Sequence, residues 1–404
     1  MIELELNETQ QNIKTMLHWF AENEMRPIAL ECDRTKEIPL SFFKKTMEMG
    51  LAGSSTPRDF GETEDVPGVP GEKKEKQSNR IAIIGSEELG WGDPALILTF
   101  PGPGLGGPPV RFTGTPEQQQ RAFAVFADKE MPHWGAYALT EPGAGSDVAS
   151  IATTCRKDGN HYILNGRKCY ITNGARADWN VVFATVDKSQ GRAAHRAFLV
   201  FKGTPGFSVG KIEDKLGLRA SETAELVLED CRVHVDDLLG GEAQYTLASK
   251  EGFRTAMKTF DNTRPLVAAM AVGIARAAWE IARDWVKEHY DLKRPIPRYH
   301  VIADMLANME REIHAARLLC WKAAWMGDLD LPNSREASVA KSYSAEVGQR
   351  VTSQAIQIMG YEGTYHHRMV EKLFRDVKVY DIFEGTGQIM RIVISRRILQ
   401  GLTA

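Results

Sequence analysis

The hydrophobic pattern of this chain changes twice, which divides it into three parts. Up to about residue 130, apolar residues recur at helical spacing, as on the face formed by Ile13, Leu17, Phe20 and Ala21. From about residue 131 to 240, short runs such as VVFATV, AFLVF and AELVLED are rich in β-branched and aromatic residues, with turn residues between them. Such runs are typical of strands. The first part therefore predicts helices and the second a sheet.

Helical spacing returns after about residue 245. Two apolar faces there repeat every four residues: Val339, Tyr343, Val347, Val351 and Ala355, and Met305, Met309 and Ile313. This order predicts an α+β chain that is mostly helical, and the missing strand–helix alternation argues against a Rossmann sheet. We expect an N-terminal helical domain at residues 1–130, an antiparallel β domain, barrel or sandwich, at 131–242, and a C-terminal helical domain at 243–404.

Local signals mark where some elements begin or turn. Asn7 with Gln10 fits a capping box, and Asn333 or Ser334 offers a cap for the helix that follows. In HYILNGRKCYIT, the dipeptide at 165–166 predicts a tight hairpin, because Asn and Gly tolerate left-handed backbone angles.

Two Pro- and Gly-rich passages interrupt the N-terminal helices. PRDFGETEDVPGVPGEKKEKQSNR, residues 57–80, is polar and predicts an exposed loop. FPGPGLGGPPVRFTGTPEQQQ, residues 100–120, cannot form one continuous helix. A plain connector and a cavity-lining loop are both open interpretations of this second passage.

Composition narrows the class of protein. The 404 residues carry a net charge of −3, which gives no case for nucleic acid or an anionic membrane as partner. No apolar run approaches the roughly 18 residues that span a bilayer, and the start MIELELNETQQ lacks the layout of a secretion signal. We therefore expect a soluble cytoplasmic protein without membrane insertion. Five cysteines without metal-ligand or redox spacing favour free thiols in a reducing cytosol: Cys32, Cys155, Cys169, Cys231 and Cys320.

The stretch VYDIFEGTGQIMR places a single carboxylate, Glu384, between an apolar Ile382-Phe383 pair and a small, flexible GTG run. A carboxylate inside an apolar segment costs several kcal/mol unless it is paired or protonated. The same placement raises a carboxyl pKa, so that the group can act as a base in a dry site. From the pattern alone, a structural role and a catalytic role for Glu384 are equally open.

Other motifs have an ordinary structural interpretation beside a functional one. TEPGAGSD, residues 140–147, has glycines that let backbone N–H groups approach a ligand, but it lacks the Lys and the setting of a P-loop, and a plain turn is favoured. YIT at 170–172 is typical of a strand end. In FDNTRP, Asp261 and Arg264 favour a helix-surface ion pair over a polar site. Neighbouring His366 and His367 point different ways on any regular element, so no metal site is expected.

Five motifs together resemble those of the acyl-CoA dehydrogenases, in that family's order from about residue 137 to the end. They are YALTEPGAGSDVASI, NGRKCYITNG, DKLGLRASETAELVLEDCRV, GFRTAMKTFDNTRP and VEKLFRDVKVYDIFEGTGQIMRIVISRRI. The resemblance implies an N-terminal helical domain, a central β-barrel domain and a C-terminal four-helix bundle. It also implies a homotetramer built as a dimer of dimers.

The resemblance further implies FAD as cofactor, an acyl-CoA thioester as substrate and an electron-transfer flavoprotein as oxidant. Glu384 then takes the α-proton while the β-hydrogen leaves as hydride to the flavin, which gives a trans-2-enoyl-CoA. Water must be excluded around such a base, a role that falls to Ile382 and Phe383. The backbone N–H of the base and a flavin hydroxyl polarise the thioester carbonyl, and the small Gly385 and Gly387 let that backbone approach.

Site residues carry over from the resemblance one by one. Tyr170 stands for the aromatic residue that shields the flavin ring, Gln357 and Gly360 match a stretch that binds FAD across a subunit contact, and Arg396 matches a residue near the coenzyme A nucleotide. The implied cofactor-binding residues are Tyr137, Leu139, Thr140, Ser146, Tyr170, Ile171, Thr172, Gln357, Gly360, Thr386 and Gln388. The implied substrate-binding residues are Ser146, Asp261, Arg264, Glu384, Gly385 and Arg396.

Three positions depart from the family pattern. His289 and Leu292 stand where the family has the Arg and Phe of its pyrophosphate-binding motif, with Arg294 or Arg298 as candidate replacements. Tyr361 replaces the second glycine of a Gly-Gly pair, and FPGPGLGGPPVRF replaces the segment that walls the acyl chain. These departures bear on FAD affinity and on acyl-chain preference. The alternatives are an acyl-CoA oxidase or other oxygen-using flavoenzyme, and a non-catalytic member with impaired FAD binding.

Overall fold

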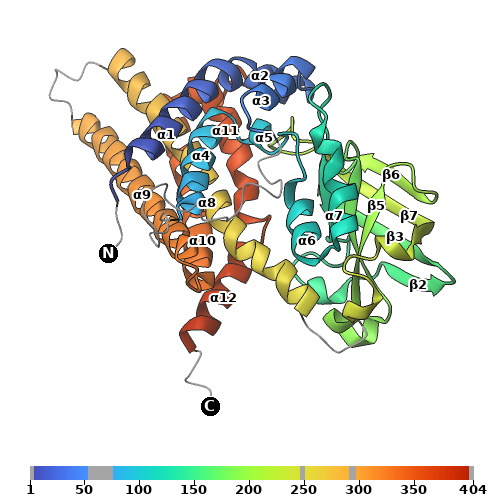
Figure 1. The fold of residues 1–404 in the computed structure, drawn as a ribbon. Helices are drawn as coiled ribbons and strands as arrows, with labels where there is room; N and C mark the ends of the chain where they lie inside the picture. The colour runs from blue at the N-terminus through green and yellow to red at the C-terminus, as the bar shows by residue number, and fades with distance from the viewer. Residues whose placement is uncertain (1–3, 53–75, 246–250, 291–296, 400–404) are drawn as a thin grey trace, which may run out of the picture.

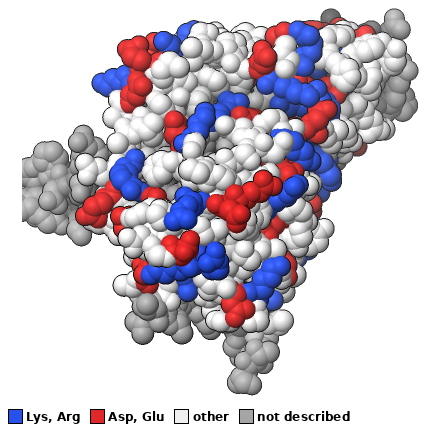
Figure 2. Space-filling view, turned by 90° about the vertical axis from the view of Figure 1, so that its right-hand side faces the viewer, with Lys and Arg blue, Asp and Glu red and all other residues white. Residues whose placement is uncertain are grey.

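The computed structural model describes residues 4–52, 76–245, 251–290 and 297–399, with secondary structure alone for 251–262 and 297–299. The long helices gather on one side of the molecule and the sheet lies on the other (Figure 1). The predicted order of helices, strands and helices is confirmed. Lys and Arg are intermixed with Asp and Glu on the face in Figure 2.

The N-terminal part is helical, as predicted. Its elements are α1 (Glu8–Phe20), η1 (Ala21–Met25), α2 (Arg26–Thr35), α3 (Leu40–Glu48), α4 (Ser78–Gly92), α5 (Pro94–Ile97), η2 (Gly104–Gly106), α6 (Gly107–Thr113), α7 (Pro116–Phe123) and η3 (Ala124–Ala127). The capping box of α1 is confirmed, because the Asn7 side chain accepts from the Gln10 N–H and the Gln10 side chain from the Asn7 N–H. Leu17 and Phe20 of the predicted apolar face are buried.

The two predicted loops have different outcomes. Residues 57–75 lie outside the described residues, and the prediction is wrong for its last residues, since Ser78–Arg80 begin α4. Asp328 explains this start: its carboxylate accepts hydrogen bonds from the Asn79 N–H at 2.8 Å and from buried Arg80 Nε at 2.8 Å. The Pro- and Gly-rich passage at 100–120 is broken as predicted, into η2, α6 and α7.

The middle part forms a seven-stranded sheet that curls into a half-barrel. Its strands are β1 (Gly135–Ala138), β2 (Thr154–Asp158), β3 (His161–Thr172), β4 (Trp179–Thr185), β5 (His195–Phe201), β6 (Phe207–Ile212) and β7 (Thr223–His234). They follow the order β1-β4-β2-β3-β7-β6, with β5 also beside β4. The antiparallel prediction holds for most pairs but is wrong for β1, which runs parallel to β4, and for one parallel pair between Thr154 and Thr185.

The hairpin predicted at Asn165-Gly166 is wrong. β3 runs straight through these residues, and the β2–β3 turn lies at residues 159–160, because Asp158 pairs with His161. Instead, Asn165 marks an irregularity in the pairing of β3 with β7. Its side chain donates to Asp230 Oδ1 at 3.0 Å and accepts from the Asp230 N–H at 2.8 Å. The conformational tolerance of Asn-Gly thus serves a bulge rather than a turn.

The C-terminal part contains the long helices of the predicted bundle. Its elements are α8 (Glu251–His289), α9 (Pro297–Asp328), α10 (Ser334–Met359), η8 (Gly360–Thr364), α11 (Met369–Val377), η9 (Lys378–Asp381) and α12 (Gly387–Leu399). Helices α8, α9 and α10 pack on one another, and α12 packs on α10. Asn333 is the N-cap residue of α10, but its side chain donates to the Ala323 carbonyl instead of capping.

Helix α8 joins the bundle to the N-terminal part. A Cβ at Gly273 would lie 2.2 Å from the Glu87 carbonyl oxygen, so glycine lets α8 and α4 approach closely. Over Thr263–His289 this helix is long and apolar enough to span a membrane by composition, but 67% of its most apolar window is buried inside the protein. Its apolar face therefore belongs to the core.

Candidate active site

Glu384 lies in the short loop between η9 and α12, close to the bundle helix α8. The backbone is left-handed at Glu384, with φ 52°, and at Gly385, with φ 98°. The side chain is partly buried, and Glu384 Oε2 accepts a hydrogen bond from Thr263 Oγ1 at 2.7 Å. Left-handed geometry at a non-glycine residue is uncommon and is often found at functional sites. It turns this carboxylate back toward α8.

The surroundings of Glu384 act on its carboxyl group in opposite directions. Burial raises the pKa of Glu384 above its ordinary value. The hydrogen bond from Thr263 and the positive charges of Arg264 and Lys341 lower that pKa, but less than burial raises it. The result is a carboxylate that binds a proton more readily than an exposed glutamate does.

Tyr137 of the sheet lies near enough to this loop to feel the charge of Glu384. It lies in β1, next to Phe183 of β4, with ring centroids 5.1 Å apart. Burial, together with the nearby Glu384 carboxylate, raises the pKa of the Tyr137 hydroxyl. The fold therefore brings together a predicted flavin-contacting residue and the predicted base, although 247 positions in the sequence separate them.

A buried ion pair ties the TEPGAGS segment to β3. Lys168 Nζ donates to Glu141 Oε1 at 2.6 Å and to the Leu139 carbonyl at 3.1 Å, and the pair is almost fully buried. The Cys169 N–H donates to the Thr140 carbonyl at 2.9 Å. Two motifs with separate predicted roles, residues 139–146 and 170–172, therefore form one structural unit.

Exposed and buried side chains alternate at the C-terminal end of β3. Tyr170 is 65% exposed and left-handed, with φ 59°, beside an irregularity in the β3–β7 pairing. Thr172 is also exposed, whereas the side chain of Ile171 is buried in the core. Tyr170 and Thr172 thus face outward as flavin contacts require, and Ile171 can contribute only its backbone.

Several other predicted site residues lie apart from Glu384 or are exposed. Ser146, Gln357, Gln388 and Arg396 are exposed on the chain as described. Gly360 is the C-cap of α10 with φ 63°. None of their described contacts joins them to Glu384. The side chain of Asp261 lies outside the described residues.

The apolar pair before Glu384 behaves differently from the prediction. Ile382 is 54% exposed, so the expectation that it keeps the site dry is wrong for this chain. Phe383 is partly buried and packs edge-on against Tyr380, with ring centroids 4.9 Å apart. Of the two apolar neighbours, only Phe383 is therefore held against the core.

Two of the three departures from the family pattern concern positions expected to bind FAD. His289 stacks on Trp285 within α8, with ring centroids 3.6 Å apart, and Leu292 and Arg294 lie outside the described residues. Tyr361 is 74% exposed and packs edge-on against Tyr365. The effect of this residue on FAD affinity remains a prediction.

Sequence reasoning missed four residues of this site: Thr263, Lys341, Glu141 and Lys168. Thr263 directly precedes Arg264 in the FDNTRP motif. Glu141 lies in TEPGAGSD and Lys168 in NGRKCYITNG, so the motifs themselves could have indicated these residues. Lys341 left a weaker signal, a lone lysine among the small residues of SVAKSYSAEV.

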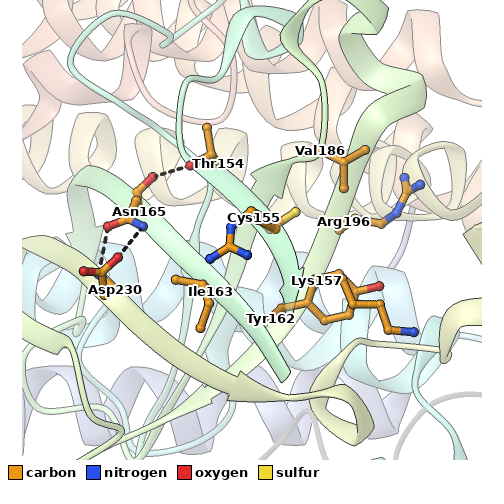
Figure 3. Close-up of a pocket in the computed structure, with 10 residues that line it drawn as sticks. Thr154, Cys155, Lys157, Tyr162, Ile163, Asn165, Val186, Arg196 and Asp230 are labelled. Atoms are coloured by element: carbon orange, nitrogen blue, oxygen red, sulfur yellow. Dashed lines mark hydrogen bonds between the residues drawn. The ribbon is translucent and has the colours of Figure 1, made fainter. Parts of the chain in front are cut away.

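A cavity of about 650 Å³ lies elsewhere, on the sheet (Figure 3). It opens where β2 meets β4 through a single pair, between Thr154 and Thr185. Arg156, Lys157 and Arg196 are among its lining residues, and none of the predicted site residues is. It is therefore separate from the site around Glu384. Among the described residues, no group of three or more His, Cys, Asp or Glu is placed to hold a metal ion.

Comparison with known proteins matches the chain along its whole length. Three family models match: acyl-CoA dehydrogenase, N-terminal domain (residues 7–130), middle domain (136–231) and C-terminal domain (250–399). A short-chain specific acyl-CoA dehydrogenase of Clostridium acetobutylicum is 37% identical over 99% of this chain and 100% of that protein.

Solved structures agree with the sequence matches. Butyryl-CoA dehydrogenase from Megasphaera elsdenii superposes with a TM-score of 0.85 at 32% identity, covering 98% of this chain and 100% of that one. A chain from a structural study of the electron transferring flavoprotein of Acidaminococcus fermentans gives a TM-score of 0.85 at 38% identity, covering 99% and 100%.

Proposed function

Because this chain belongs to the acyl-CoA dehydrogenase family, we propose that Glu384 is the base that removes the α-proton of a short-chain acyl-CoA. The protein is an oxidoreductase that uses FAD to dehydrogenate an acyl-CoA thioester between its α and β carbons. Family membership establishes that reaction. The base, the acyl length and the electron acceptor are what we propose.

The placement of Glu384 carries the proposal. It is a partly buried carboxylate with a raised pKa, held by Thr263 and close to Tyr137. The α-proton of a thioester is a very weak acid, so its removal needs a desolvated base in a fixed position. Among the residues around the loop, Glu384 has both properties.

The described residues fit a flat aromatic cofactor at the C-terminal end of β3. Tyr170 presents an exposed ring, and a Cβ at Gly143 or Gly145 would meet no atom within 4 Å, so the backbone of this segment is open to a ligand. Residues 137–146 and 170–172 would hold the FAD, which when bound supplies the acceptor for the β-hydride.

The chain's own residues then prepare the proton transfer. The Thr263 hydroxyl holds one carboxylate oxygen of Glu384 and leaves the other to accept the α-proton. Phe383 and Tyr380 exclude water on one side, so that the carboxylate is less stabilised by solvent. The left-handed backbone presents the Glu384 N–H as a donor for the thioester carbonyl, where negative charge develops during the reaction.

Relatives support a short acyl chain and a protein electron acceptor. The Clostridium relative is named short-chain specific, and a solved neighbour is a butyryl-CoA dehydrogenase. A similar chain occurs in the study of an electron transferring flavoprotein, which supports such a flavoprotein as the oxidant here. All five cysteines are free and buried, which supports a cytoplasmic location.

A panel of acyl-CoA thioesters mixed anaerobically with the holoenzyme tests the function. We expect the flavin absorbance to bleach fastest with a four-carbon acyl chain and more slowly as the chain lengthens. The bleached signal should persist when air is admitted and recover with an electron-transfer flavoprotein.

Other outcomes of the panel contradict separate parts of the proposal. Recovery in air alone would identify an acyl-CoA oxidase. Fastest bleaching by a long or aromatic acyl chain would contradict the short-chain assignment. Colourless protein that does not take up added FAD would indicate the non-catalytic alternative.

A further inference from the structure

A lysine to which the proposed reaction gives no role lies beside the base. The side chain of Lys341, in α10, is fully buried. Its Nζ donates to the Gly385 carbonyl at 2.5 Å. Removing an ammonium group from water is costly unless charges and hydrogen bonds compensate for it. Burial of Lys341 is therefore not explained by apolar packing, and its hydrogen bond to the loop is the compensating contact.

The loop that Lys341 contacts needs support. Glu384 and Gly385 are left-handed in succession, and for a non-glycine residue this conformation is unfavourable because Cβ crowds the following carbonyl oxygen. Thr263 holds the Glu384 carboxylate from α8, and the Thr386 carbonyl accepts from the Met390 N–H at the start of α12. Between these two contacts, Lys341 holds the backbone of the loop itself.

Resting on the proposed role of Glu384, we propose that Lys341 is a positioning residue for the reaction: its ammonium group holds the Gly385 carbonyl and thereby fixes the Glu384 carboxylate. Its described hydrogen bond goes to the loop backbone and not to a predicted flavin-contacting residue. It acts through the loop, and its charge also favours the ionised form of the base.

Several charged groups surround Lys341 and Glu384 and influence the protonation of both. Burial lowers the pKa of Lys341 to about 8, although Asp381 and Glu384 raise it in part. The group is therefore mainly protonated at neutral pH. Arg264 from α8 acts on Glu384 in the same direction as Lys341. Burial and the nearby Glu384 charge raise the pKa of the Tyr137 hydroxyl from β1, so that this group is neutral.

Two substitutions separate the hydrogen bond from the charge. Lys341→Met removes both, whereas Lys341→Gln keeps a donor for Gly385 and removes only the charge. Lys372→Met is the matched control, because Lys372 is an equally buried lysine of the same part, paired with Asp93 and Asp376 instead of the active-site loop.

The limiting rate of anaerobic flavin reduction and its pH dependence give the readout. We expect Lys341→Met to lower the plateau rate about tenfold or more with little change in KM, because misplacing a catalytic group slows chemistry steeply. Its acid-side midpoint should rise by about one pH unit, because a neighbouring positive charge no longer favours the carboxylate. Lys341→Gln should show the same rise with a smaller loss of rate.

A readout without turnover checks the same shift. Infrared difference spectra during a pH titration, with Glu384→Gln subtracted, report the protonated carboxyl group of Glu384. Its midpoint should rise in both Lys341 variants and stay at the wild-type value in Lys372→Met. If Lys341→Met does not fold, the rise in Lys341→Gln carries the test.

The proposal is overturned if the midpoint of Glu384 protonation is unchanged in both Lys341 variants and they lose as much folding stability as Lys372→Met. Lys341 would then be merely structural. That result is distinct from a failure of the proposed function. If Glu384→Gln itself reduces the flavin at a normal rate, the base has been misassigned whatever Lys341 does.

Discussion

At Glu384, opposing influences meet on one carboxyl group. Burial favours the neutral acid, whereas the Thr263 hydroxyl and the charges of Arg264 and Lys341 favour the carboxylate. An exposed glutamate would be ionised but too well solvated to take a proton from carbon. A buried glutamate without these partners would stay protonated at neutral pH. The proposed role of Glu384 as the base depends on both sets of influences.

Thr263→Val tests one of these influences, because valine keeps the shape of threonine and removes the hydroxyl. The hydrogen bond favours the carboxylate and so lowers the pKa of Glu384. Without it, that pKa rises, and the acid limb of flavin reduction should move to higher pH while the alkaline plateau changes less. Anaerobic stopped-flow across the pH range measures both. An acid limb at or below its wild-type position would contradict this role for Thr263.

The sequence predicts only part of this site. Glu384 stands out because an acid interrupts an apolar run, and one short stretch shows that pattern. Its partners do not stand out, because Thr263 and Lys341 lie 121 and about 40 positions away and meet it only after the bundle has packed. Ile382 fails as a shield for the same reason: apolar character in the sequence does not fix which side of a loop faces solvent.

At the scale of elements, β3 organises the cofactor side of the site. Its residue Lys168 holds Glu141, and the Glu141 carboxylate also accepts from the Ala152 and Thr153 N–H groups. Two residues further on, β3 presents Tyr170 outward. One buried cluster thus fixes the distance between the TEPGAGS segment and the exposed aromatic ring.

Glu141→Gln removes the negative charge from this cluster and leaves Lys168 buried without its ionic partner. Breaking such a pair costs about 3–5 kcal/mol, so we expect a lower unfolding midpoint and faster loss of FAD on gel filtration. Asp214→Asn is the control, because Asp214 pairs with Lys36 on the surface and should change neither property. Normal FAD retention in Glu141→Gln would contradict the anchoring role.

The sequence predicts helices where apolar residues keep helical spacing over a long stretch, as in α1 and α10. It predicts less well where contacts between distant segments determine the local structure. Asn-Gly is compatible with both a turn and a bulge, and the pairing of β3 with β7 selects the bulge. The polar residues that open α4 read as loop, yet the Asp328 carboxylate, far along the chain, anchors them as a helix start. Neither outcome is present in the local sequence.

At the scale of the whole molecule, a buried cluster joins all three parts. Lys372 of α11 contacts Asp93 at the start of α5, and also Asp376 at 2.6 Å. Asp376 in turn accepts from the Leu218 N–H of the β part at 2.6 Å. This cluster therefore holds α11 against the N-terminal and β parts of the chain.

Helix α12 leaves Ile392, Ile398 and Leu399 exposed within the described residues. Apolar side chains exposed together on one helix suit a protein interface, so we propose that α12 contributes to the contact between subunits of the homotetramer that the resemblance implies.

Ile392→Asp combined with Ile398→Asp should lower the mass of the assembly measured by light scattering, because it places charge in that interface. Val209→Asp, at an exposed position in β6 on the far side of the molecule (Figure 1), should leave the mass unchanged. A full-size assembly in the α12 variant would place the interface elsewhere.

The rate of flavin reduction in Glu384→Gln tests the central claim most directly. Glutamine keeps the size of the side chain and an acceptor for Thr263 but cannot take a proton. We predict that FAD content and acyl-CoA binding stay near wild type while the anaerobic reduction rate falls by about 10²–10⁴ or more, the loss expected for a general base. Reduction within about tenfold of wild type, below that range, would mean that another group removes the proton.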